Sequence, residues 1–253
     1  MRQLKSMMIC RKYLMNLFNK TVLKKIFKFL LIASIISCSK DEDISLELNE
    51  YDLEVISYFK DIALGFEFGS ASEVTRKWCS ELKIFIGGEI SSELIVELNN
   101  IVSEIEKLTT DNFSIQIVND SSLSNYYIYF GSGENYANIF PSQENYINSN
   151  WGLFSVWWTN NCIDRGHMYV DIFRANDTEK KHLLREELTQ SLGLAKDSDR
   201  YPFSIFQSSW TRTMKYTDLD KDLIRLLYHP RMEIGLDAIG ADFKLREILL
   251  SEK

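Results

Sequence analysis

Polar side chains that could do chemistry together lie in one stretch of the chain, between residues 182 and 193. His182, Glu186 and Gln190 follow one another at steps of four, so they would share one face of an α-helix. Glu187 lies beside that face, one position on. When two carboxyl groups are buried near one another, their ionisations couple and one pKa rises. Glu186 and Glu187 are therefore candidates for a pair that donates or accepts a proton.

This spacing is also that of a zinc-binding helix, but the zinc ligands are missing. Such a helix holds the ion with two histidines one turn apart, and a glutamate between them takes a proton from bound water. Here Glu186 and Gln190 occupy the two histidine positions, and Lys196 occupies the position of a third. Zinc prefers nitrogen and sulfur ligands to oxygen, and a lysine repels a cation. We therefore expect no zinc and no other cofactor, although Glu187 keeps the position of a general base.

Helical periodicity by itself favours a plainer interpretation of these residues. Glu186 and Glu187 would then be ordinary exposed glutamates of a charged helix, and His182 a surface or capping histidine. Gly193 is well placed to adopt the left-handed conformation that follows many helices. The apolar side of the helix is formed by four leucines: Leu183, Leu184, Leu188 and Leu192.

The elements that must position this helix alternate between strands and helices. A long backing helix, with Ser91 or Ser92 as its cap, carries apolar residues on one face: Leu94, Leu98, Ile101, Ile105 and Leu108. Further helices are expected at 51–64, 179–192, 217–229 and, as a helix or a tail, 243–253. β-Rich runs predict strands at 78–88, 113–118, 126–131, 151–158 and 167–173, with a polar loop at 132–150. This order favours an α+β or α/β domain with one mixed sheet, followed by a small helical C-terminal subdomain.

The first 37 residues are typical of a secretory signal. A basic start precedes a short apolar run at 26–36, and Met15 would give a signal of ordinary length. The sequence IISC at the end of the run is similar to a bacterial lipobox, in which the cysteine takes a lipid. Cys38 is therefore the predicted lipidation site and membrane anchor, an ordinary signal peptide with an incidental cysteine being the alternative.

The predicted organisation is a lipoprotein signal peptide at 1–37, an acidic tether at 38–50 and one domain at 51–253. The acidic SKDED after the lipobox is similar to a motif that sends some Gram-negative lipoproteins to the outside of the cell. We expect an outer-membrane lipoprotein that faces either the periplasm or the cell surface.

The distribution of charge argues against nucleic acid as a partner. The first 37 residues hold eight of the 29 basic residues and no acid, which leaves 21 basic against 36 acidic residues in the rest. Because nucleic-acid binding needs a basic surface, this acidic body argues against it.

Processing at Cys38 leaves Cys79 and Cys162, which can form one disulfide in an oxidising compartment, two buried thiols being the alternative.

The body of the chain resembles an uncharacterised bacterial family of unknown function whose fold is thought to be related to the metzincin zinc proteases. The resemblance rests on EELTQSLGL, on DSD followed by SIF, and on LLYHPRM followed by IGL, and it covers roughly residues 55–240. It implies a metzincin-like, or zincin-like, sheet with the active-site helix packed behind it, and EExxQ in place of HExxH. Phe206 would lie where those proteases make a methionine turn.

Three functions remain open at this point. The first is binding of a peptide or glycan in a cleft formed around Glu186, Glu187, Gln190 and Gly193, with aromatic residues that could line it: Trp151, Trp157, Trp158 and Tyr201. The second is a peptidase-like hydrolase with Glu187 as general base and a metal held by oxygen ligands, including Asp197 or Asp199. The third is a structural component of the envelope. A serine or cysteine nucleophile has no supporting motif.

Overall fold

The computed structural model describes residues 47–253, which form one compact unit. The predicted signal peptide, the lipidation site Cys38 and most of the tether lie outside the described residues. Within the described part of the chain, no helix has both the length and the apolar character needed to cross a membrane.

A six-stranded sheet forms the centre of this unit. Its strands are β1 (Lys77–Trp78), β2 (Leu82–Gly88), β3 (Ile115–Val118), β4 (Tyr126–Gly131), β5 (Gly152–Thr159) and β6 (Cys162–Asp171). The spatial order is β1-β6-β4-β2-β3, with all of these pairs parallel, and β5 pairs with β6 in the antiparallel direction. The sheet is mixed, as predicted, but mostly parallel, so the domain is of mixed α/β type. A parallel pair needs a long connection between its strands, and a helix supplies it between β2 and β3.

Six α-helices accompany the sheet: α3 (Glu50–Ala63), α4 (Ser92–Leu108), α5 (Gly133–Ile139), α6 (Asp177–Gln190), α7 (Asp218–Leu227) and α8 (Ala238–Ser251). Two short 3₁₀ turns, η1 (Ser121–Leu123) and η2 (Pro141–Gln143), complete the elements. The caps follow local chemistry, since Ser91 caps α4 and Thr217 caps α7 through side-chain hydrogen bonds to the first turn.

The segment 132–150 is not only the polar loop that its composition predicts. Ser132 accepts a hydrogen bond from the backbone of Asn135 and starts α5, whose Tyr136 is fully buried. The C-terminal part is helical, as predicted, and its helices α7 and α8 pack with α3 within the same compact unit. A short polar helix with a few buried side chains has too little periodicity to be detected in the sequence.

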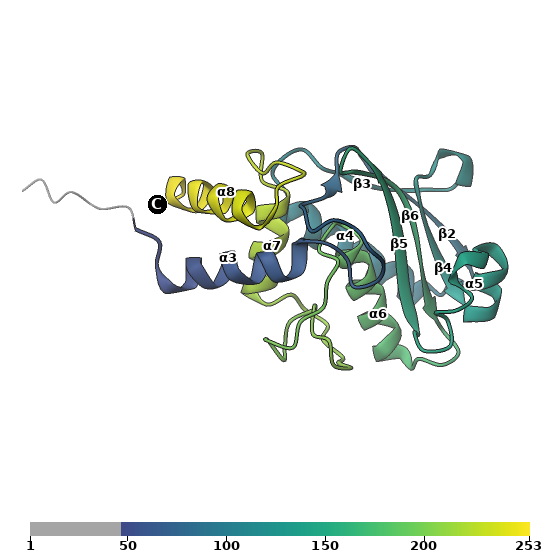
Figure 1. Ribbon diagram of the computed structural model, residues 1–253. Helices are drawn as coiled ribbons and strands as arrows, with labels where there is room; N and C mark the ends of the chain where they lie inside the picture. Colours follow the sequence, from purple (N-terminus) through teal and green to yellow (C-terminus); the bar gives the residue numbers. More distant parts are fainter. Residues whose placement is uncertain (1–46) are drawn as a thin grey trace, which may run out of the picture. The chain divides into compact units, whose positions relative to one another are not determined.

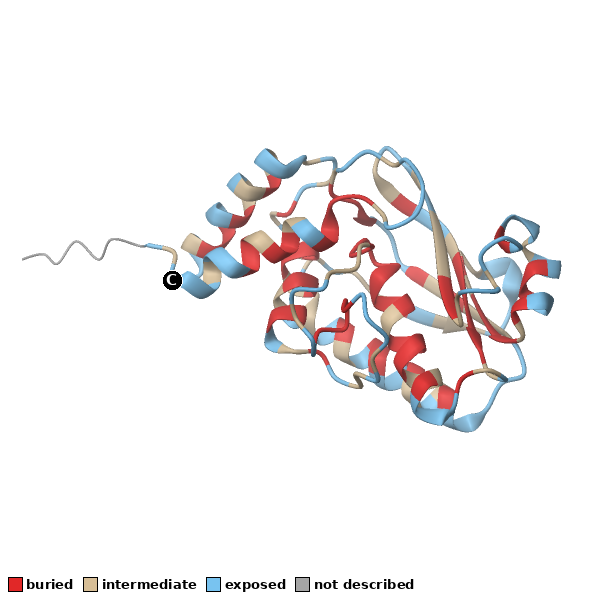
Figure 2. Ribbon diagram, turned by 60° about the horizontal axis from the view of Figure 1, so that its bottom comes forward, coloured by how far each residue is buried: buried red, intermediate tan, exposed pale blue. Residues whose placement is uncertain are grey.

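Helices cover both faces of the sheet (Figure 1). On one face, α4 and α6 pack against alternate residues of β4, Tyr126, Ile128 and Phe130, in the main core. On the other face, α5 covers a smaller core that contains Tyr129 and Tyr169. Figure 2 shows buried positions along the sheet and the inner sides of the helices, with exposed positions on their outer sides. This arrangement places α6 directly behind β5 and β6.

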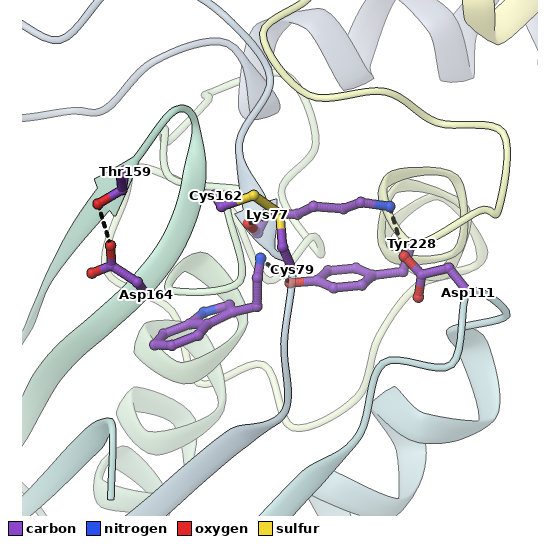
Figure 3. The surroundings of a disulfide bond; sticks show 8 residues. Lys77, Cys79, Asp111, Thr159, Cys162, Asp164 and Tyr228 are labelled. Carbon is purple, nitrogen blue, oxygen red and sulfur yellow. Dashed lines mark hydrogen bonds and ion pairs between the residues drawn. A yellow bond between two sulfur atoms is a disulfide. The ribbon is translucent and has the colours of Figure 1, made fainter.

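A disulfide between Cys79 and Cys162 joins the end of β1 to the start of β6 (Figure 3). These are the two cysteines that the sequence analysis pairs. Close by, Lys77 forms an ion pair of 2.6 Å with Asp111, and the Tyr228 hydroxyl accepts the backbone N–H of Trp78. The short strand β1 is therefore held by side-chain contacts on several sides.

Candidate functional site

A cleft of about 700 Å³ lies between α6, β5 and two loops. One loop contains Phe66–Ala71, and the other contains Gln207–Thr211. Strand β5 borders the cleft along nearly its whole length, from Gly152 to Trp158. Helix α6 contributes five residues: His182, Leu183, Glu186, Glu187 and Gln190. The structure therefore brings together the polar residues that the sequence places on one helical face.

Helix α6 is fixed on the side away from the cleft. Asn176 caps its first turn in a reciprocal arrangement with Glu179. In the middle of the helix, the buried guanidinium of Arg185 forms ion pairs with Glu97 at 2.9 Å and with Glu104 at 2.6 Å, both on α4. Since a buried charge is tolerated only when it is paired, these contacts hold α6 against α4 and leave its other polar residues for the cleft.

Glu187 is the most unusual of the cleft residues. Its side chain is only 8% exposed, yet among the described residues it has no hydrogen bond and no ion pair. Its carboxyl group packs over Gly152 of β5, where an added Cβ would lie 2.6 Å from Oε1. Burial, and then the nearby carboxyl groups of Glu186, Asp197 and Glu67, raise the pKa of Glu187 well above its ordinary value. A proton donor or acceptor is thus held in the cleft wall.

Glu186 faces His182, whose Nε2 lies 3.3 Å from its Oε2. The Nδ1 of His182 is 2.8 Å from the carbonyl oxygen of Thr213, which only accepts, so Nδ1 carries a hydrogen. Burial lowers the pKa of His182, and burial raises that of Glu186. The Oγ1 of Thr211 lies 3.2 Å from the same Nε2, so the imidazole is held between α6 and the loop of Thr211. The surface positions that periodicity favours for these residues, and for Glu187, are wrong because both sides of α6 are covered.

Gln190 completes the row, and its amide donates a hydrogen bond to Asp197. Burial raises the pKa of Asp197. Burial and then the charge of Asp197 raise the pKa of Glu67, which lies on the neighbouring loop. Asp199 is exposed and lies outside the cleft lining.

Two further residues of the motif do not reach the cleft. Lys196 points to Glu73, with which it forms an ion pair of 2.9 Å. Gly193, predicted as a cleft residue, lies outside the cleft lining. Its φ is 112°, and it packs against the backbone of Arg76. The prediction of a left-handed conformation after the helix is confirmed, and that of a cleft position is wrong.

Aromatic side chains form much of the cleft wall. Trp151, Trp157 and Trp158 line it, as the sequence analysis expects. Tyr201 does not, because its hydroxyl bonds to Glu54 at 2.6 Å and its ring packs edge-on against Tyr58.

Further aromatic residues of the cleft lie on the two loops and were not predicted from the sequence. Phe66 stacks on Trp158 with ring centres 5.1 Å apart, and Trp210 packs edge-on against Trp151 at 5.1 Å. Phe68 is 49% exposed at the rim. These residues are far from α6 in the sequence and lie in irregular segments, so no local pattern marks them.

Among residues 47–253, no group of three or more His, Cys, Asp or Glu side chains is arranged to hold a metal ion. The oxygen ligands that the hydrolase alternative would use are Glu186, Gln190 and Asp197, of which Gln190 and Asp197 are bonded to each other.

Substitution of Glu187 by glutamine is expected to stabilise the protein at neutral pH. A carboxyl group with a raised pKa in the folded state stabilises that state below its ordinary pKa of 4.5 and loses this contribution as pH rises. Glutamine has no such titration. We expect a gain of about 0.5–2 kcal/mol in the free energy of unfolding at pH 7.5 and little change at pH 4. Urea denaturation at the two pH values measures it.

The matched control is Glu144→Gln, which changes an exposed glutamate of the loop after α5 and should alter stability at neither pH. If Glu187→Gln is equally destabilising at both pH values, the carboxyl group has a partner that the structure does not give it.

Comparison with known proteins gives one family. A family model described as "Protein of unknown function (DUF2927)" matches residues 52–246, most of the chain. The chain therefore belongs to this family, which confirms the resemblance to an uncharacterised family. No curated protein matches the sequence.

Proposed function

We propose that this member of the DUF2927 family binds an extended peptide in the cleft, on a fold related to the metzincins and without a zinc ion. Strand β5 carries the proposal. It pairs with β6 on one side, has no strand partner on its other side within the described residues, and borders the cleft from Gly152 to Trp158. An edge strand presents unpaired N–H and C=O groups, and an extended peptide can add to it as a further strand.

The edge strand favours a peptide over the glycan that the sequence leaves open. A glycan has no repeating backbone of donors and acceptors that matches a strand edge. The tryptophans of β5 would then contact peptide side chains, which alternate along an added strand.

The metzincin relationship is supported by the order of the elements around the cleft. The helix with EExxQ runs behind the antiparallel edge strand, and Glu187 lies on the cleft side of that helix. Phe206 is fully buried, and Gln207, the next residue, lines the cleft, as expected for a turn below the site.

Binding should show in the backbone of β5. A positional-scanning peptide library offered to the full chain would give a ligand, and hydrogen exchange would then slow at the β5 amides that point away from β6. N-methylation of alternate peptide amides should weaken binding by about twofold to tenfold for each lost hydrogen bond. Methylation at the intervening positions is the internal control. Tight binding of a glycan array, with no change in β5 exchange, would overturn the peptide proposal.

A hydrolase is the second candidate, because the unpaired, buried Glu187 with its raised pKa suits a general base or acid. Elemental analysis of the full chain purified without chelator, with Glu186→Ala and Glu187→Ala beside it, is the first test. Near one equivalent of metal that is lost in Glu186→Ala supports this candidate, and mass spectrometry would then seek cleaved peptides. If the wild-type chain shows neither peptide binding nor cleavage and Glu187→Gln leaves every phenotype unchanged, a structural role in the envelope is favoured.

We also propose that the domain is tethered to the outer membrane through a lipid on Cys38. The proposal rests on the IISC sequence and on the short distance in sequence from Cys38 to α3, the first helix of the described residues, which begins at Glu50. A labelled fatty acid should be incorporated into the full chain and not into Cys38→Ala, which should be released from the membrane fraction. Equal labelling of the two proteins would exclude Cys38 as the anchor.

A further inference from the structure

The acidic and basic side chains that line the cleft all have one sign. Four carboxyl groups line it, those of Glu67, Glu186, Glu187 and Asp197, and no lysine or arginine is among its lining residues. His182 is the one lining side chain that can become cationic, and burial lowers its pKa. The cleft is therefore unsuited to an acidic ligand, since each carboxylate would repel it.

Of the three carboxyl groups contributed by Glu186, Glu187 and Asp197, only that of Glu187 has no partner among the described residues and is available to a ligand. Asp197 accepts the amide of Gln190, and Glu186 faces His182. Glu187, more than nine-tenths buried and lining the cleft, has no partner among the described residues. A buried carboxyl group without a partner destabilises the folded protein, and a donor from outside would remove that penalty.

The walls are aromatic and partly exposed. Trp157 on β5 is 37% exposed and Trp210 on the facing loop is 54% exposed, and Trp151 and Trp158 also line the cleft. Guanidinium groups from outside the lining already lie over three of these rings, those of Trp151, Trp157 and Trp158. The face of an indole attracts a cation, more strongly than the faces of phenylalanine and tyrosine do. Among the described residues no cation lies over the ring of Trp210, so this indole and the carboxyl groups of the cleft favour the same charge in a ligand.

The lining fits an organic cation better than a metal ion. The described residues offer no group of three or more His, Cys, Asp or Glu arranged for a metal. An ammonium or guanidinium group needs only one well-placed carboxylate and apolar contact for its stem, which Glu187 and the tryptophans supply.

We infer that the cleft recognises a lysine or arginine side chain of the bound peptide, with Glu187 as the residue that receives its charge. This inference rests on the proposed peptide-binding function and adds the class of peptide. Binding of the cation favours the ionised form of the carboxyl groups, so it should release protons near neutral pH.

The test uses the full chain and four libraries of fluorescent heptapeptides. The flanking positions are randomised, and the central residue is fixed as lysine, arginine, norleucine or glutamate. We expect the lysine and arginine libraries to bind about tenfold or more tightly than the norleucine library, and the glutamate library to bind least. A hydrogen bond to a charged group contributes roughly tenfold or more to binding.

Variants then separate charge from packing. Glu187→Gln should reduce binding of the best lysine peptide about tenfold and leave its norleucine analogue unchanged, while Glu144→Gln should change neither. Calorimetry in two buffers of different ionisation enthalpy should detect proton release with the lysine peptide only. Addition of EDTA should change nothing.

The outcomes are distinguishable. Equal binding of the norleucine and lysine libraries, with slowed exchange in β5, would overturn the inference and leave the proposed function standing. Failure of all four libraries to bind would overturn both. Loss of lysine-peptide binding on addition of EDTA would show that a metal occupies the site and would also overturn the inference.

Discussion

Removal of the Cys79–Cys162 disulfide is expected to lower the free energy of unfolding by about 2–5 kcal/mol. The two cysteines are 83 residues apart in the sequence, so the bond closes a long loop and restricts the unfolded chain strongly. It also holds β1, which has only two residues and pairs only with Cys162 and Ile163 of β6. Urea denaturation of the double variant Cys79→Ser/Cys162→Ser measures the loss.

The wild-type protein with its disulfide reduced is the control, and its unfolding midpoint should agree with that of the double variant. The cleft should also respond, because Arg76, next to β1, places its guanidinium 4.4 Å from the ring of Trp158. Tryptophan fluorescence should therefore change before global unfolding. An unchanged urea midpoint in the double variant would show that the disulfide does not restrict the unfolded state.

Gly193→Ala is expected to destabilise the protein by about 2–4 kcal/mol, and two separate effects contribute. The φ of 112° at this position is unfavourable for any residue with a Cβ. In addition, the new Cβ would lie 2.0 Å from the carbonyl oxygen of Arg76. That oxygen belongs to the backbone, so no side-chain rotation relieves the overlap, and α6 must move away from β1. Thermal and urea denaturation both measure the effect.

Gly69→Ala provides a matched control for the second effect. Gly69 also has a positive φ, of 96°, but an added Cβ there meets nothing within 4 Å. Its substitution should therefore cost only about 1–2 kcal/mol, the conformational part. The difference between the two variants measures the close approach of α6 to β1. Equal losses would mean that this approach relaxes without cost.

Both predictions concern the same segment, residues 76–79. Its Arg76 carbonyl meets Gly193, the indole N–H of Trp78 donates to the carbonyl of Ser191 at 3.0 Å, and Cys79 forms the disulfide. The end of α6 is therefore fixed to the sheet by one short strand. Because Gln190 is in the last turn of α6, movement at this contact would shift the polar row of the cleft.

Features that depend on neighbours along the chain could be predicted from the sequence. The apolar spacing of α4, its serine cap and the left-handed Gly193 all depend on residues within a few turns of one helix. The β-rich runs likewise predicted most of the strand positions, because side-chain direction alternates along any strand. The predicted strand 78–88 is divided into β1 and β2, and β6 begins at Cys162 rather than at residue 167. The step of four residues was enough to place His182, Glu186 and Gln190 on one side of α6.

The surroundings of those residues depend on the tertiary structure and could not be predicted from the sequence. The same spacing suits a solvent-exposed helix face and a cleft wall. Here the face forms a cleft wall because β5 lies opposite it, and the position of β5 is set by its pairing with β6 and not by any residue of α6. Burial raises the pKa of Glu187, and burial comes from distant segments such as Gly152 and the loop of Phe66. Tyr201 is aromatic like the tryptophans but lies outside the cleft, because contacts with a distant segment, the helix α3, determine its position. Desolvation and close packing are set by the whole fold, so local spacing cannot specify them.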